Sequence, residues 1–127
     1  MTPIKRIILD RVEGRVSELA EREVRSFKEA DLILREWAKT APADRSYHKV
    51  DVVVEWENGQ SIAHRFDLQS PDIARINLAE DFKTRLKYNA GLYCPPGISQ
   101  QAYFNAVYAM PEANKQAKRI LKECQLS

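Results

Sequence analysis

Hydrophobic and polar residues alternate along two neighbouring segments in the middle of the chain, residues 47–56 and 61–68. Alternation with a period of two is typical of β-strands that bury one face. The dipeptide Asn58–Gly59 lies between the two segments and is a strong short-range signal for a tight turn. The pattern therefore predicts an antiparallel β-hairpin over residues 47–68.

Two registers of this hairpin differ in how they pair the charged residues. A two-residue loop at Asn58–Gly59 places charged residues of the second segment opposite valines of the first. A three-residue loop that includes the preceding glutamate pairs Asp51 with Arg65 and Lys49 with Asp67. Because a slip of one residue changes every partner, the complete charge pairing favours the three-residue loop. We interpret these four residues as a structural charge ladder rather than a functional site.

Helical spacing of apolar residues marks the segments on either side of the hairpin. Residues 26–39 begin with a capping box, Ser26 to Glu29, and keep their apolar residues on one face, which predicts an amphipathic helix. After the hairpin, either one helix runs over Pro71–Asn89 or a short turn precedes a helix that starts at Leu78. Further helices are expected over residues 99–110 and 111–124.

The first 24 residues allow two readings. Their apolar positions fit a helix, but part of the segment also alternates as a strand, so we expect a helix or strand that ends near Gly14, followed by a short extended piece. The whole pattern predicts an α+β fold, with a small antiparallel sheet built on the 47–68 hairpin and helices from both ends of the chain packed on it.

Length and composition fit one domain of this kind. The chain has 127 residues, of which 44% are apolar and 30% charged, and its net charge is +2. That charge is too small to indicate a general nucleic-acid binder or a DNA mimic. With no long apolar run, a cytoplasmic protein with no membrane contact is expected, in which Cys94 and Cys124 are reduced thiols.

Residue types that support catalysis or metal binding occur without a matching arrangement. His48 and His64 fall on the apolar face of the predicted hairpin, without ligand spacing, so we interpret them as core histidines. Cys94 precedes two prolines and has no neighbouring base that could activate it. The sequence therefore predicts a non-enzymatic protein with no metal and no cofactor.

The last third of the chain carries features that favour a partner-binding surface. Tyrosines are frequent at interfaces, and three of them, Tyr93, Tyr103 and Tyr108, precede the last helix. That helix divides into an apolar face and a cationic face formed by Lys115, Lys118, Arg119 and Lys122. The alternatives are that the tyrosines pack the helices onto the sheet and that the cations form an ordinary solvated face. Lysines and arginines between residues 75 and 87 extend the cationic face if the helices lie side by side.

Residues 17–76 resemble a family of modules, the large polyvalent protein-associated domains. In that family a helix precedes a hairpin of the form "GYxKxDFxVxxxDGxxYxGRxDL". The positions that match here are Ser26, Phe27, Glu29, Ala30, Asp31, Tyr47, Lys49, Asp51, Gly59, Arg65, Asp67 and Leu68. Two glycines of the family pattern are replaced by Ser46 and His64. Residues 77–127 form a helical part of their own within the same domain.

The resemblance implies a context rather than a reaction, because such modules occur in proteins of phages, plasmids and conjugative elements. We therefore expect a protein that binds and blocks a host protein or ribonucleoprotein, of the anti-CRISPR or anti-restriction type, by steric occlusion. The alternative is a nucleic-acid-binding accessory of conjugation or replication. We expect a monomer or a homodimer, with Trp56, at the end of the first hairpin strand, at a free edge where a second copy could pair.

Overall fold

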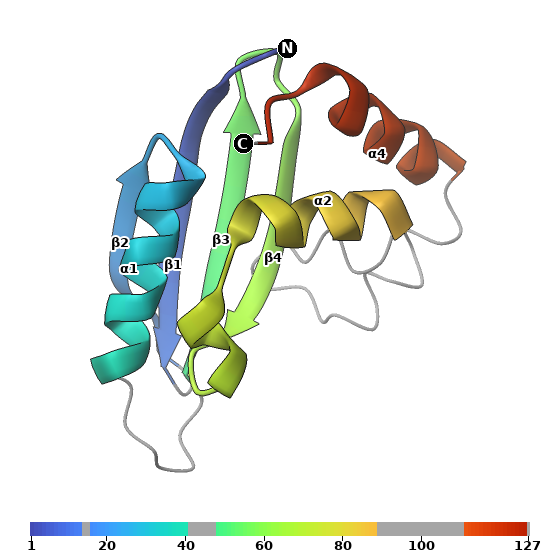
Figure 1. Cartoon of the computed structure of the whole chain (residues 1–127). Helices are drawn as coiled ribbons and strands as arrows, with labels where there is room; N and C mark the ends of the chain where they lie inside the picture. The colour runs from blue at the N-terminus through green and yellow to red at the C-terminus, as the bar shows by residue number, and fades with distance from the viewer. Residues whose placement is uncertain (14–15, 41–47, 89–110, 127) are drawn as a thin grey trace.

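The structure, a computed structural model, describes residues 1–13, 16–40, 48–88 and 111–126, which form one antiparallel sheet and a layer of helices (Figure 1). The α+β prediction is confirmed. In the described part of the chain the sheet has four strands, in the order β2-β1-β3-β4. The elements are β1 (Ile4–Glu13), β2 (Val16–Val24), α1 (Phe27–Thr40), β3 (His48–Trp56), β4 (Ser61–Asp67), the 3-10 helix η1 (Pro71–Arg75), α2 (Leu78–Tyr88) and α4 (Pro111–Glu123).

The β3–β4 hairpin has the register of the three-residue loop. Asp51 lies opposite Arg65, and Lys49 lies opposite Asp67. Gly59 has a φ of +86°, a conformation that a residue with a side chain rarely adopts, and its amide donates to the carbonyl oxygen of Trp56 at 3.0 Å. The turn chemistry and the charge pairing therefore specify the same register.

The N-terminal segment is a strand, so the helical alternative for residues 2–24 is wrong. β1 lies in the interior of the sheet, between β2 and β3, and places Ile7 opposite Val54 and Leu9 opposite Val52. All four side chains are fully buried. The alternation of the segment, rather than its approximate helical spacing, thus determines the structure, because a second apolar strand is available as its partner.

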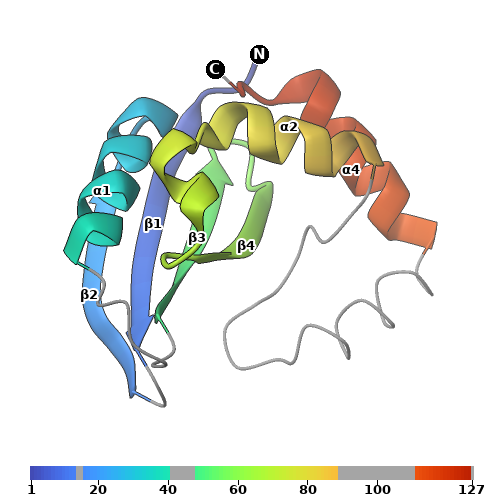
Figure 2. The ribbon, with the colours of Figure 1, turned by 60° about the horizontal axis from the view of Figure 1, so that its bottom comes forward.

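The helices that the structure describes all lie on one face of the sheet (Figures 1 and 2). Phe82 of α2 is fully buried, and its ring lies 6.1 Å from that of Phe66 on the sheet and 6.2 Å from that of Phe27 on α1. The chain after the hairpin forms η1 and then a separate helix from Leu78, which decides between the two alternatives for this region. The helix expected over residues 99–110 lies outside the described residues.

The two ends of the described chain meet beside the hairpin turn (Figure 1). The amide of Thr2 donates to the carbonyl oxygen of Glu123 at 2.7 Å, and the amide of Gln125 donates to the carbonyl oxygen of Thr2 at 2.8 Å. The indole Nε1 of Trp56 donates to the carbonyl oxygen of Gln125 at 2.8 Å. We call this arrangement the terminal clasp.

The clasp corrects the expectation for Trp56. Its side chain is only 1% exposed, and the residue pairs with Ile4 in the neighbouring strand. β3 is therefore an interior strand at this point and offers no free edge to a second copy. The choice between monomer and homodimer stays a prediction.

Candidate partner-binding surface

The cationic face of α4 is turned away from the protein. Ala117, Ile120 and Cys124 are buried against the core. The side chains of the opposite face are exposed: Lys115, Lys118, Arg119 and Lys122. The guanidinium of Arg119 lies 3.7 Å from the carboxylate of Glu123, four residues on, which is a weak pair at a solvent-exposed site.

α2 packs beside α4 and carries cations of its own. Lys83 and Lys87 are exposed on α2. Arg85 is directed elsewhere, because it binds the carboxylate of Asp81 at 2.7 Å and lies over the ring of Phe66. Arg75 belongs to η1, which packs against α1. We use the name α4 surface for Lys83 and Lys87 together with the four exposed cations of α4.

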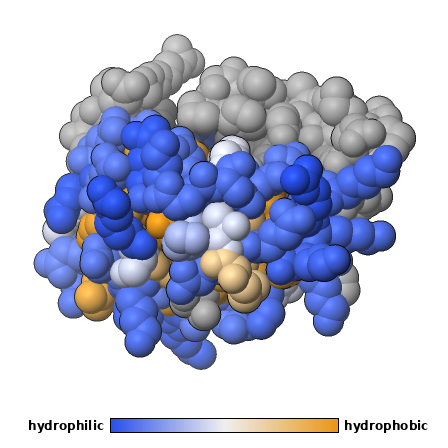
Figure 3. Space-filling model, turned by 90° about the horizontal axis from the view of Figure 1, so that it is seen from above, coloured by the Kyte–Doolittle hydropathy of each residue, from blue (hydrophilic) through white to orange (hydrophobic). Residues whose placement is uncertain are grey.

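Seen from above, the described surface is hydrophilic over most of its area, with only small and separate hydrophobic spots (Figure 3). On this side, therefore, charge and hydrogen bonding offer a partner more than apolar area does. The predicted contact residues Tyr93, Tyr103 and Tyr108 lie outside the described residues, so their role stays a prediction.

The charge ladder lies on the face of the sheet opposite the described helices. Arg65 binds the carboxylate of Asp51 through two nitrogens, at 2.6 and 2.9 Å, and Lys49 lies 3.0 Å from that of Asp67. Sequence analysis missed a third pair in this face, in which Arg6 binds Glu55 at 2.9 Å, because it left open whether the N-terminal segment is a strand. The pairs connect three strands of the sheet.

The centre of the ladder places two carboxylates opposite each other. Asp51 on β3 faces Asp10 on β1, and like charges in this position are unfavourable. The side chain of Asp51 is only 2% exposed, although no described helix covers this face. Arg65 therefore differs from the cation of an ordinary surface ion pair, because it compensates the charge of a carboxylate that is buried from solvent.

Two carboxyl groups of the ladder have lowered pKa values. The hydrogen bond from Arg6 lowers the pKa of Glu55, against the smaller opposing effect of burial. Burial has the largest single effect on Asp67 and acts to raise its pKa, but the amide of Gln69 and the ammonium of Lys49 together outweigh it and lower that pKa. Both groups are thus held in the charged form by the fold.

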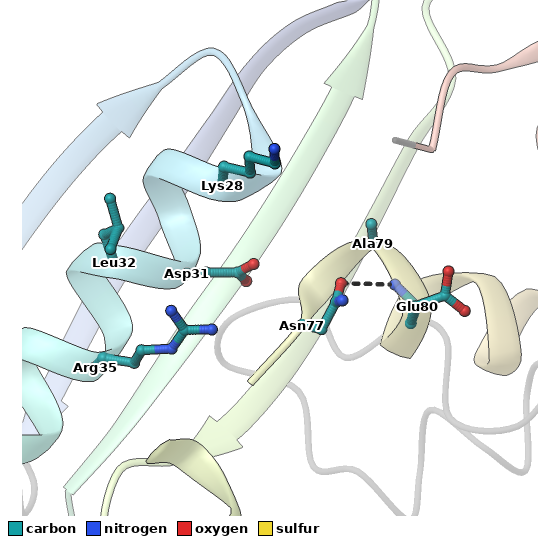
Figure 4. Close-up of a pocket in the computed structure, with 7 residues that line it drawn as sticks. All are labelled: Lys28, Asp31, Leu32, Arg35, Asn77, Ala79 and Glu80. Atoms are coloured by element: carbon teal, nitrogen blue, oxygen red, sulfur yellow. Dashed lines mark hydrogen bonds between the residues drawn. The ribbon is translucent and has the colours of Figure 1, made fainter. Parts of the chain in front are cut away.

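A pocket of about 520 Å³ lies between α1 and the first turn of α2 (Figure 4). Asp31 and Arg35 project from α1 toward Asn77. The residues that line the pocket are Lys28, Asp31, Leu32, Arg35, Asn77, Ala79 and Glu80. The pocket could not be predicted from the sequence, because tertiary packing sets the distance between the two helices. The one signal in the sequence was Asp31, an acidic residue among the apolar residues of its helix.

Asp31 connects the two walls of the pocket. It is 8% exposed, and its Oδ1 accepts a hydrogen bond from the amide of Leu78, the first residue of α2, at 2.9 Å. Asn77 caps the same helix locally by accepting from the amide of Glu80 at 3.2 Å. Burial raises the pKa of Asp31, while the Leu78 amide and the charge of Arg35 act in the opposite direction.

Arg35 is held at the pocket wall. Its Nη2 donates to the carbonyl oxygen of Ile76 at 2.8 Å, just before α2 begins. Its Nε is buried and has no hydrogen-bond partner among the described residues. A guanidinium has five N–H groups, so the described contacts leave donor capacity on this side chain.

Of the other residues considered for chemistry, His48, His64 and Cys124 are buried in the core, and Cys94 lies outside the described residues. His48 and His64 are 3% and 6% exposed, on the helix-covered face of the sheet. Burial raises the pKa of the Cys124 thiol, which disfavours the reactive thiolate. Within the described ranges, no three or more His, Cys, Asp or Glu side chains group as a metal site would require.

Comparisons with protein-family models, curated proteins and solved structures found no match to this chain. None of the helices in the described part of the chain combines the length and the apolar character that crossing a bilayer requires.

Proposed function

We propose that this protein is a non-enzymatic binding protein that docks through the α4 surface onto an acidic surface of a host protein or ribonucleoprotein and blocks it sterically. The observation that supports this proposal most directly is the exposure of Lys115, Lys118, Arg119 and Lys122 along one helix face, beside the exposed lysines of α2. Clustered charge of one sign accelerates association with a surface of the opposite sign.

The choice of a counter-defence role comes from the resemblance of residues 17–76 to modules of phages and mobile elements. Steric occlusion requires no reaction, so a small protein that docks on an acidic surface can block a large defence complex by covering a neighbouring functional region. A nucleic-acid-binding accessory protein is the second candidate, because the same cations could contact phosphates.

Affinity capture from host-cell lysate tests the proposal. The bait is the intact protein, and captured proteins are identified by mass spectrometry. The variant K118E/R119E reverses two charges on the α4 surface and should lose the captured partner. The matched control is K39E/R75E, which changes the net charge equally but lies at the opposite end of the helical layer, on α1 and η1, and should retain it.

A gel shift over a salt series separates the two candidates. Binding to phosphates weakens steeply as salt rises, with a slope set by the number of phosphates contacted. The proposed inhibitor should shift a captured host complex and leave free nucleic acid unshifted. A direct, salt-sensitive shift of free DNA or RNA, lost in K118E/R119E, would instead establish the accessory role.

A further inference from the structure

The pocket between α1 and α2 has walls of mixed chemistry. Arg35 and Lys28 supply positive charge, and Leu32, which is 63% exposed, supplies apolar surface. Leu32 is one of two large hydrophobic side chains that are strongly exposed in the described part of the chain. Two cationic side chains together with an exposed leucine suit a ligand that carries a carboxylate next to an apolar group.

The pocket also contains two carboxylates, Asp31 and Glu80, and they differ in how they affect this positive charge. Asp31 is engaged by the Leu78 amide and lies near Arg35, so its charge is used within the protein. Glu80 points away from α1, on the far side of the first turn of α2 (Figure 4). On the α1 side of the pocket, Lys28 and Arg35 lie on either side of the Asp31 carboxylate (Figure 4). An incoming group therefore meets the ammonium and the guanidinium as two separate cations.

The pocket is also aligned with the α4 surface. Lys83 and Lys87 follow Ala79 by one and two helical turns, so they lie on the same side of α2. The exposed face of α2 therefore leads from the pocket toward α4, which packs beside it. A partner that contacts α4 and α2 can place its next residues at the pocket.

We propose that this pocket binds a carboxylate of an acidic, partly apolar segment of the partner protein, with Arg35 and Lys28 facing the carboxylate and Leu32 contacting the neighbouring apolar side chain. The inference rests on the proposed function, since it names the chemistry of the partner. A nucleic-acid strand fits less well, because its phosphate backbone gains nothing from the exposed Leu32.

The test is an NMR titration of the intact ¹⁵N-labelled protein with the probe N-acetyl-Leu-Glu-amide. We expect saturable shifts of the amides of Asp31, Leu32, Arg35 and Ala79, with a dissociation constant on the order of 1 mM for so small a ligand. N-acetyl-Leu-Gln-amide, which lacks the charge, should bind about tenfold more weakly. Equal binding of the two probes, or no saturable shift at these amides, would overturn the proposal.

Two variants and a second ligand complete the experiment. R35Q should weaken binding about tenfold. K28E changes only an exposed rim residue, so it should remain folded and still bind more weakly. If short oligothymidylate shifts the pocket amides and the peptide probe does not, the pocket binds phosphate and the proposal fails. The titration does not involve α4, so its outcome is independent of the capture experiment.

Discussion

The carboxylate of Asp31 on α1 accepts a hydrogen bond from the amide of Leu78, the residue that opens α2, across 47 positions of sequence. This side chain caps a helix to which it does not belong, and so fixes the relative position of the two helices. Substitutions of Asp31 can separate two contributions to the free energy of unfolding, that of the hydrogen bond and that of the buried charge.

Asp31→Asn should cost little or stabilise the protein at neutral pH. Asparagine keeps an acceptor for the Leu78 amide and removes a charge whose burial raises the pKa of Asp31. Asp31→Ala leaves that buried amide without its acceptor and should lower the free energy of unfolding by about 1 to 2 kcal/mol. Urea denaturation followed by circular dichroism measures both values. An asparagine variant as unstable as the alanine variant would show that the charge itself is required.

The second prediction concerns the central pair of the charge ladder. Arg65→Ala should lower the free energy of unfolding by about 2 kcal/mol, because it leaves Asp51, 2% exposed and opposite Asp10, without its compensating cation. The double variant D51A/R65A should be more stable than R65A alone, since it removes the uncompensated carboxylate as well. A complete double-mutant cycle by chemical denaturation tests this order. If neither single variant changes stability but partner binding is lost, the ladder is a functional site.

Acid should weaken the fold through Glu55 and Asp67. Their pKa values are lower in the folded protein than their ordinary values of 4.5 and 3.8, so their contribution is complete above those values and is lost as pH falls through the folded-state pKa values. Asp31 acts in the opposite sense: its raised pKa makes stability rise as pH falls through its folded-state pKa toward its ordinary value of 3.8.

Denaturant titrations between about pH 3 and pH 6 resolve these effects. Glu55→Gln should flatten the acid-side loss of stability more than the matched change Glu57→Gln, at the exposed hairpin turn. An Asp31→Asn profile that falls more steeply toward acid than that of the parent would agree with the assigned sign. A shallower fall would contradict it.

The terminal clasp gives a fourth prediction. Trp56→Phe removes the hydrogen bond to the Gln125 carbonyl oxygen and should increase the opening of the C-terminal end of α4. Cys124, fully buried nearby, reports this opening through its rate of reaction with a thiol reagent, measured in a Cys94→Ser background. We expect the rate to rise about fivefold to tenfold, as a loss of about 1 kcal/mol implies. The control Gln125→Ala keeps the carbonyl and should have a much smaller effect.

The fifth prediction distinguishes the α4 surface from the tyrosines once a partner is identified. K118E/R119E should slow association, and the difference from the parent should shrink as salt screens the charges. Tyr93→Ala or Tyr108→Ala should speed dissociation. If either tyrosine is an anchor, the loss of binding free energy should be about 1 to 2 kcal/mol. Surface-based kinetic measurements together with melting curves separate these effects from unfolding. Parent-like binding by all folded variants would place the site elsewhere, first on the exposed side of α1.

Local sequence signals were enough to predict the hairpin, because its turn residues and its four ladder charges agree on a single register. The helix at α1 was predictable for a similar reason: Ser26 accepts from the Glu29 amide, as the capping pattern requires. The first strand was ambiguous, because its period could not be decided until a partner strand was known. Local pattern carries no information on that partner.

Part of the candidate site could likewise be predicted from the sequence and part could not. The exposed cations of α4 could be predicted from helical periodicity, since the apolar half of the helix must face the core. The pocket beside α1 could not, because it depends on how α1 and α2 approach each other and on the long-range cap at Asp31. Likewise, the opposition of Asp10 and Asp51 follows from a strand pairing that local pattern does not specify.

The hydrogen bonds that join Thr2 to Glu123 and Gln125 have a kinetic consequence. They link residues that are far apart in the sequence, so the loop that they close includes the strands and helices from β1 to α4. Closing it late, after local hairpins and helices have formed, avoids most of the entropy cost. During synthesis, Trp56 and the start of β1 emerge from the ribosome long before α4 does. Until α4 and Gln125 have been made, this corner of the protein has to remain open, so the described residues reach their final packing only after α4 has emerged.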